Sequence, residues 1–166
     1  FFNSTLSGNT LSGNGIDDVL IGGTLSTDAT WGVGASPYVV SSLTVAAGVT
    51  LTIDPDVVVK FAAGGSLTVN GTLVADASGG SPITFTSLKD DTVGGDTNGD
   101  GSATSPAAGD WFGLYLQASS TGNLLDHIEI RYAVRPIARM EIAYDDPHSN
   151  APDPDHIFPM MFQTLI

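Results

Sequence analysis

Hydrophobic and polar residues alternate over short stretches between residues 38 and 86, which predicts β-strands with one buried face. In residues 49–53, for example, Val49, Leu51 and Ile53 alternate with two threonines. Further alternating stretches lie at 43–45, 57–61, 67–69, 73–75 and 83–85. Turn residues separate them, as at Gly64-Gly65 and Asn70-Gly71. The predicted strands are short, about 4–6 residues each.

The strand pattern repeats along the chain. The tetrapeptide Ser-Leu-Thr-Val begins at Ser42 and again at Ser66, and a Thr-Leu step follows each copy, at Thr50 and Thr72. An earlier Thr-Leu step at Thr24 precedes Thr50 by a similar interval and predicts an equivalent position in the preceding unit. An antiparallel sandwich uses similar strands, but the recurrence favours a parallel β-helix, a solenoid that stacks each unit on the next.

Two segments depart from the repeat. Residues 87–110 are polar and glycine-rich and predict a long loop ejected from one unit, after which strands resume at 111–116 and 125–132. Past residue 133 the composition shifts towards proline and methionine, and 136–144 predicts a short helix. We therefore expect a β-helix domain at 1–133, which includes a strand at 16–21, and a C-terminal cap or tail at 134–166. Three interpretations of that segment stay open: it covers an open end of the stack, it docks on another chain, or it is foreign to the original protein.

Residues 31–132 resemble the right-handed parallel β-helix repeats of large bacterial secreted and surface proteins. The resemblance rests on Ser36–Val40, on 43–53, on Val58–Phe61 and on Pro82–Ser87. It implies an all-β, right-handed parallel β-helix with an adhesin-like role. It leaves function open, because β-helices also serve as lyases, epimerases and hydrolases.

The excess of acidic residues limits the classes of partner that the chain can bind. Acidic residues outnumber basic ones 18 to 5, for a net charge of −13, and 16 of the acids are Asp. Phosphates and anionic membranes would be repelled, which argues against both as partners. There is no cysteine for a disulfide scaffold. The chain starts without Met or a basic leader, so we expect a processed product or an excised piece of a secreted or cell-surface protein.

The strongest chemical motif is the run from Asp96 to Gly101, Asp-Thr-Asn-Gly-Asp-Gly, which fits the first half of the calcium-loop pattern D-x-[DN]-x-[DN]-G. Oxygen ligands at the first, third and fifth positions converge because glycine at the sixth permits a sharp turn. The run resembles the calcium loops of dockerins, but position twelve is alanine instead of glutamate. The ligands predicted for Ca²⁺ are Asp96, Asn98, Asp100 and the Ser102 carbonyl, with Asp110, Asp90, Asp91 or water replacing the missing glutamate. The alternative is a solvated turn without an ion.

A second group of polar residues lies at 127–131. If Ile128 and Ile130 point inward, His127, Glu129 and Arg131 lie in a row on the outer face and are acid–base candidates for a carbohydrate-active enzyme. The plainer interpretation is a surface ion pair. Weaker candidates are an Asp-Pro-His tripeptide as in alginate epimerases, a transition-metal group in the tail, and sugar-stacking aromatics: Asp146–His148; His148, Asp155 and His156; Trp31, Trp111 and Tyr115.

Together these features favour a non-enzymatic, calcium-stabilised structural or adhesive module. Self-association through the open ends or the tail is expected, and a polysaccharide is a candidate partner. The alternative function is a polysaccharide lyase, epimerase or hydrolase of the β-helix class.

Overall fold

The computed structural model describes residues 20–34 and 36–140, and these form an all-β structure of parallel sheets. The strands are β1 (Leu20–Leu25), β2 (Ala29–Trp31), β3 (Tyr38–Val45), β4 (Thr50–Ile53), β5 (Val58–Val69), β6 (Thr72–Asp76), β7 (Ile83–Ser87), β8 (Gly113–Leu116), β9 (Leu124–Asp126), β10 (Ile128–Ile130) and β11 (Ile137–Arg139). Within these ranges no helix is long and apolar enough to cross a membrane.

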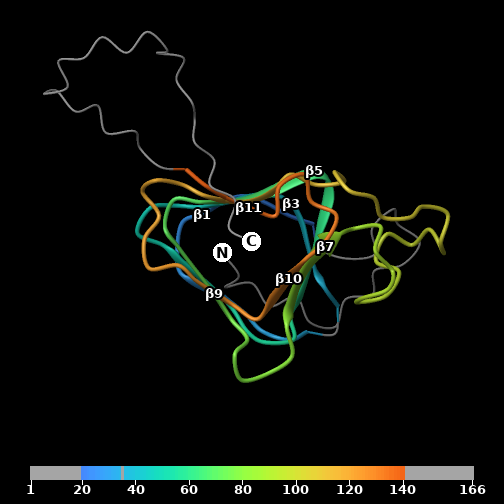
Figure 1. The fold of residues 1–166 in the computed structure, drawn as a ribbon, viewed down its shortest axis with the longest axis horizontal. Helices are drawn as coiled ribbons and strands as arrows, with labels where there is room; N and C mark the ends of the chain where they lie inside the picture. The colour runs from blue at the N-terminus through green and yellow to red at the C-terminus, as the bar shows by residue number, and fades with distance from the viewer. Residues whose placement is uncertain (1–19, 35, 141–166) are drawn as a thin grey trace, which may run out of the picture.

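From β1 to β7, successive strands alternate between two sheets, so neighbours in a sheet are not neighbours in sequence. The first sheet runs β1-β3-β5-β7-β10, with β8 pairing β5 and β11 pairing β8. The second sheet runs β2-β4-β6-β9. Figure 1 looks along the direction in which the strands stack, and the ribbon surrounds a central core. The chain thus passes through both sheets in each repeat unit and returns to pair in parallel with its own earlier strand.

The strand register confirms the sequence repeat at its clearest point. Ser42 pairs with Ser66 and the rest of the tetrapeptide follows in step, while Thr50 pairs with Thr72 in the second sheet. The third expected equivalence is wrong, because Thr24 pairs with Thr44 in the first sheet and not with Thr50. The Thr-Leu step at Thr24 belongs to a strand of the other sheet, which so short a similarity could not reveal.

A glycine corner divides β5, where two separate strands were expected. Its first half pairs with β7 and its second half with β8. Gly64 has a φ of 70°, and a Cβ on Gly65 would lie 2.3 Å from the Ser41 carbonyl oxygen. The predicted turn is therefore a tight corner inside one continuous strand, packed directly on the corner of β3.

The core consists of inward-facing side chains stacked from one repeat unit to the next. Leu43 and Leu67 pair in register in the first sheet, as do Leu51 and Leu73 in the second, and all are at most 3% exposed. Phe61 stacks on Trp111 with ring centroids 4.1 Å apart and planes 3° from parallel. Burial of this apolar surface is the main source of stability.

The short helix predicted over 136–144 is wrong in its described part. Residues Ile137–Arg139 form β11, which pairs in parallel with β8 and buries Ala138 to 3% exposure. Backbone pairing with the open edge of β8 overrides the local helical pattern. It satisfies the N–H and C=O groups of β8, which a surface helix would leave without a backbone partner. The predicted strand at 16–21 lies mostly outside the described residues, as do residues 141–166, and the boundary at 133 stays a prediction.

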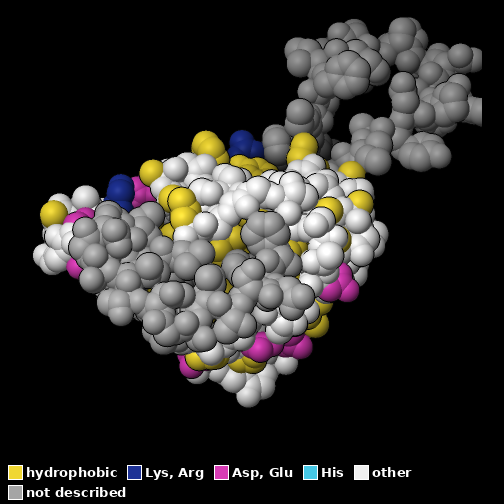
Figure 2. Space-filling model, turned by 180° about the vertical axis from the view of Figure 1, so that it is seen from behind, with side chains coloured by type: hydrophobic (Ala, Val, Ile, Leu, Met, Phe, Trp, Pro, Cys, Tyr) yellow, Lys and Arg dark blue, Asp and Glu magenta, His cyan; other side chains and the backbone are white. Residues whose placement is uncertain are grey.

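Charge is unevenly spread over the surface. In Figure 2 the acidic side chains lie around the rim of the visible face, whereas Lys and Arg side chains appear only towards its upper edge. Of the five basic residues, Arg131, Arg135 and Arg139 all fall within the last described stretch of chain.

Candidate metal site

The loop between β7 and β8 folds back over the outer face of the first sheet. Outward-facing side chains on β5 and β7, which would otherwise meet solvent, are buried beneath it: Lys60 and Thr86 are fully buried. A Cβ on Gly94 would lie 2.4 Å from the Pro37 ring and 3.4 Å from the Lys60 chain. The loop expected to be ejected is therefore packed against the sheet, which places its acidic residues over a buried lysine.

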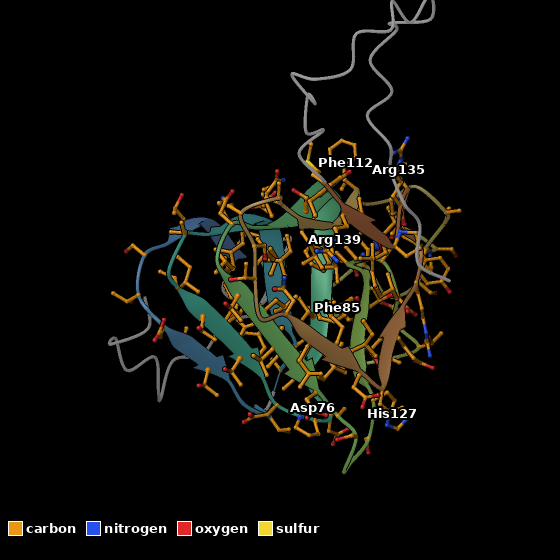
Figure 3. All side chains as sticks on the ribbon, turned by 60° about the vertical axis from the view of Figure 1, so that its left-hand side comes forward. Asp76, Phe85, Phe112, His127, Arg135 and Arg139 are labelled. Atoms are coloured by element: carbon orange, nitrogen blue, oxygen red, sulfur yellow. The ribbon has the colours of Figure 1, made fainter. Side chains whose placement is uncertain are left out.

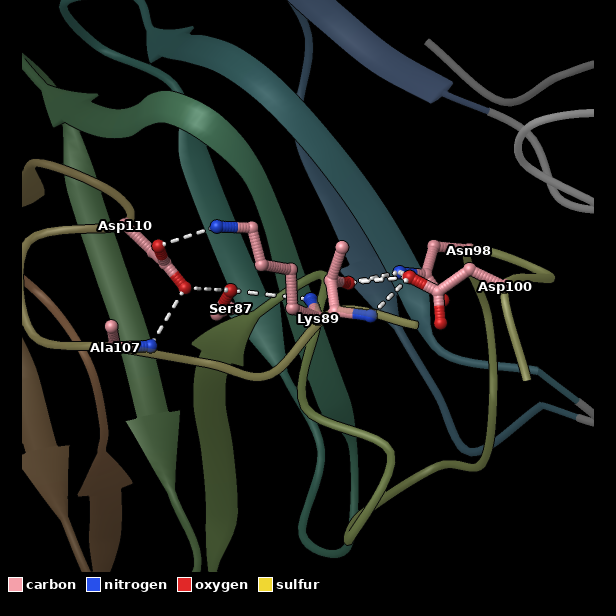
Figure 4. A network of polar contacts seen from close by, with 7 residues as sticks. Ser87, Lys89, Asn98, Asp100, Ala107 and Asp110 are labelled. Atoms are coloured by element: carbon pink, nitrogen blue, oxygen red, sulfur yellow. Dashed lines mark hydrogen bonds and ion pairs between the residues drawn. The ribbon is translucent and has the colours of Figure 1, made fainter. Parts of the chain in front are cut away.

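Asp110 closes the base of this loop (Figure 4). Its carboxylate accepts hydrogen bonds from Lys89 Nζ at 2.9 Å, from Ser87 Oγ at 2.8 Å and from the Ala107 N–H at 3.0 Å. Burial alone would raise the pKa of Asp110, but these hydrogen bonds and the Lys89 charge outweigh it and hold the pKa below its usual range. Asp110 therefore holds the base of the loop together.

Asp90 holds the start of the loop in a similar way. Its side chain is fully buried and accepts from Thr86 Oγ1 at 2.7 Å and from the Thr92 hydroxyl at 2.5 Å. Arg131 lies 3.7 Å away. Burial opposes ionisation, yet the two threonines and the guanidinium together lower the pKa of Asp90. Like Asp110, this predicted replacement ligand is not among the loop carboxylates that converge, which are Asp91, Asp96 and Asp100.

The turn that carries the calcium motif is organised around two carboxylates. Asp96 accepts from the N–H groups of Asp100 at 3.1 Å and Gly101 at 2.8 Å. Gly99 and Gly101 both have φ near 70°, as the sharp turn of the motif requires.

Asp100 is the second of these carboxylates. It accepts from the N–H groups of Ser102, Ala103 and Thr104, from the Thr104 hydroxyl and from the Asn98 amide. The hydroxyl of Thr104 is the first cause of the lowered pKa of Asp100. These contacts keep the carboxylate ionised, which is the form that binds a cation.

Three carboxylates from this loop converge. Oxygen atoms of Asp91, Asp96 and Asp100 lie within 4.8 Å of one another. Two belong to the motif, and Asp91 is the one predicted replacement ligand that joins them. Oδ1 of Asp91 and Oδ1 of Asn98 are both buried without a hydrogen-bond partner. Carboxylate oxygens are ligands that hard divalent cations prefer, so the three carboxylates fit such an ion. Asn98, a predicted ligand, directs its amide nitrogen at Asp100, at 2.8 Å.

Lys60 is the residue of this site that sequence reasoning missed. Its ammonium donates to the Gly95 carbonyl at 2.5 Å. Burial lowers its pKa, while the nearby Asp91, Asp90 and Asp96 carboxylates act in the opposite direction. Alternation along β5 places Lys60 on the outer face, where a lysine is ordinarily solvated, and only the overlying loop makes it part of the site.

A pocket of about 300 Å³ lies between the two networks of the loop. Its walls include Lys89 and Asp110 on one side and Asn98 and Asp100 on the other, as seen in Figure 4.

Ser102 has a φ of 115° and directs its N–H to Asp100.

The second candidate group does not form a row of free catalytic side chains. His127, at the bend between β9 and β10, has a φ of 53°, and its Nδ1 lies 3.1 Å from the Ala77 carbonyl. Arg131 and Glu129 form an ion pair at 2.7 Å. Of the weaker candidates, Trp31 and Trp111 are core residues, buried to 2% and 0% exposure. The candidates at 146–148, 155 and 156 lie outside the described residues.

No protein-family model, no curated protein and no solved structure matches the chain.

Proposed function

We propose that this chain is an extracellular structural or adhesive module, built as a right-handed parallel β-helix and stabilised by calcium bound in its inserted loop. The observation that carries the proposal is the convergence of the Asp91, Asp96 and Asp100 carboxylates. The calcium ion is proposed as a structural ligand that orders the loop against the first sheet.

The β-helix part of the proposal is supported by the pairing pattern. Equivalent residues in neighbouring repeat units recur at similar intervals, as in the pairs of Thr50 with Thr72, Ser42 with Ser66, and Val59 with Phe85. Every pairing between the described strands is parallel. A chain that returns in parallel to the same sheet does so almost always with a right-handed crossover, which favours the right-handed form.

The charges at the site suit a divalent ion. The three converging carboxylates and the Lys60 ammonium leave a formal charge of −2, which one divalent cation balances. The buried, unpartnered Oδ1 of Asp91 would gain a cation to coordinate. Extracellular calcium modules bind at roughly 10⁻⁴–10⁻³ M, so occupancy would follow the millimolar calcium found outside cells. This dependence is why we propose an extracellular location.

Titration calorimetry with 5 mM calcium chloride, paired with thermal melting, tests the proposal. We expect a dissociation constant of roughly 10⁻⁴–10⁻³ M and, at ten times that concentration, about 1.4 kcal/mol of added stability. Asp96→Asn combined with Asp100→Asn should abolish both signals. Asp126→Asn is the matched control, because Asp126 is exposed and lies outside the loop. Absence of heat and of any melting shift in the parent chain would refute a calcium role.

The enzyme alternative gains no support from the described residues. Neither the pocket in the loop nor a smaller pocket beside Tyr38 is lined by His127, Glu129 or Arg131. Glu129 and Arg131 instead neutralise each other on the surface. A polysaccharide as a ligand of the adhesive surface remains within the proposal, and catalysis is not proposed.

A further inference from the structure

The stack of strands ends in an incomplete layer at β9, β10 and β11, here called the terminal edge. Each of these strands pairs with one earlier strand and with no later strand among the described residues. A strand with one unpaired side exposes backbone donors and acceptors that readily accept another segment. In Figure 3 these strands cross the near end of the molecule, with Arg135 and Arg139 towards one side and His127 towards the other.

The inward side chains of the terminal edge are less buried than their equivalents one repeat unit earlier. Each pairs in register with a residue that is 0% exposed, yet each is itself only partly buried. The pairs are Leu125 with Ala75, Ile128 with Ile83, Ile130 with Phe85, and Ile137 with Leu114. Leu124 beside them is 46% exposed. The core therefore continues to this layer, where no later strand among the described residues covers it.

The opposite end differs. Ile21, Leu25 and Trp31, the inward residues of β1 and β2, are at most 5% exposed. Incomplete burial is thus not a property of both end strands of the stack, and it is concentrated at the terminal edge.

The terminal edge also differs in charge from the rest of the chain. Residues 124–139 carry Arg131, Arg135 and Arg139 against Asp126 and Glu129, a formal charge of +1 in a chain with a net charge of −13, and Arg131 is already paired with Glu129. An acidic, partly apolar segment is the complement of such a surface.

The chain itself supplies a segment of that kind. The Met140 N–H donates to the Leu116 carbonyl, so the chain leaves directly from the terminal edge. Residues 141–166 contain five acidic residues and no Lys or Arg, and they include the apolar run Ile157-Phe158-Pro159-Met160-Met161-Phe162. This segment is as long as the interval from Val59 to Phe85, which are equivalent residues of neighbouring units. It is therefore long enough to lay one further turn of chain over the stack.

We propose that residues 141–166 cover the terminal edge, placing their apolar run over its exposed aliphatic side chains and their acids near its arginines. Tethering favours this segment over a second copy of the chain, because an attached segment acts at a millimolar effective concentration. The segment thereby blocks end-to-end association at this end. This inference goes beyond the calcium proposal and does not depend on it.

Hydrogen exchange and the dye ANS test the cover in the full-length chain. Phe158→Asp combined with Met161→Asp should raise the exchange rates of amides in residues 124–139 by about tenfold and increase ANS fluorescence. Val33→Asp is the control, since Val33 is 64% exposed and lies in the N-terminal part of the described chain, and it should change neither. Arg139→Glu alters only an exposed charge and should raise the same exchange rates by about threefold, reflecting charge complementarity.

Three results would overturn the proposal. Exchange rates and ANS fluorescence that are the same in the parent and the double variant would show that the segment covers nothing. Unchanged exchange rates in a folded Arg139→Glu protein would show that the proposed charge contact is not made. This variant still tests the proposal if the double variant does not fold. Protection of 124–139 that rises with protein concentration, together with a doubled mass in light scattering, would assign the terminal edge to a second copy.

Discussion

A glycine in the stack of strands, Gly71, and two glycines in the inserted loop, Gly95 and Gly101, are required for different reasons. In the stack, a Cβ on Gly71 would lie 2.1 Å from the Val49 carbonyl oxygen, so glycine is required by the close approach of two backbones. In the loop, nothing lies within 4 Å of a Cβ on Gly95 or Gly101, but both have φ near 70° and bend the chain in the left-handed region. Close packing is the constraint at Gly71 in the stack, and local backbone geometry is the constraint at Gly95 and Gly101 in the loop.

The two regions also bury their side chains differently. The stack buries aliphatic and aromatic residues, whose contribution is insensitive to pH. The loop buries polar groups, with Asp90 and Lys60 both fully buried and both bonded to their surroundings. The stack should thus respond to lost volume and the loop to lost charge, and each of the following substitutions tests one side of this difference.

The largest effect is expected from Phe61→Ala in the stack. Phe61 is 1% exposed and stacks on Trp111 at the far end of the loop. Removing its ring leaves a cavity and should lower the free energy of unfolding by about 3–5 kcal/mol. Phe112→Ala, at a side chain that is 50% exposed, should cost under about 1 kcal/mol. Urea unfolding measures both, and similar losses in the two variants would contradict the stacked core.

Gly71→Ala should come next, because the new methyl group meets backbone atoms that cannot move away. We expect a loss of about 3 kcal/mol in urea unfolding. Gly79→Ala provides the matched control, since nothing lies within 4 Å of a Cβ there. That variant should be unchanged or up to about 1 kcal/mol more stable. A well-tolerated Gly71→Ala would show that neighbouring repeat units are not in such close contact.

The sequence alone predicted the strands of the stack better than the contacts of the loop. Alternation and the Ser42 and Ser66 copies predicted parallel stacking in the correct register, because strand pairing repeats the same local pattern. The sequence misplaced the Thr24 step and the helix over 136–144, since both depend on which strand edge is open nearby. The spacing of the calcium motif predicted that Asp96 and Asp100 lie close together. It could not identify Lys60, whose role arises only when the loop folds over the sheet.

A smaller effect is expected from Asp110→Asn at the base of the loop. The substitution removes the ion pair with Lys89 and weakens the hydrogen bonds from Ser87 and Ala107. Hydrogen bonds to a buried charge are worth about 1.5–3 kcal/mol. Because Lys89 is 37% exposed and partly screened, we expect a loss of about 1–2 kcal/mol. Asp126→Asn, at an exposed carboxylate, should stay within about 0.5 kcal/mol of the parent chain.

The smallest predicted effect, and the one that separates loop from stack most directly, is the response to acid. The folded protein lowers the pKa values of Asp90 and Asp110 below the ordinary 3.8. A carboxyl whose pKa is lower in the folded state adds stability that is fully present above pH 3.8 and is lost as the pH falls through the folded value. The free energy of unfolding should therefore be nearly constant from pH 7 to about pH 5 and decline below pH 4.

Urea unfolding at pH 7, 4.5, 3.5 and 2.5 measures this decline. Asp110→Asn should flatten part of it, because its amide cannot titrate, and its curve should approach that of the parent chain at pH 2.5. Phe61→Ala should leave the shape of the curve unchanged and only lower it, since a lost ring removes no ionisable group. If Asp110→Asn and the parent chain declined in parallel, the loop carboxylates would not be stabilised by their protein donors. The acid response would then not distinguish the loop from the stack, where hydrogen bonds from Ser78 lower the pKa of Asp76.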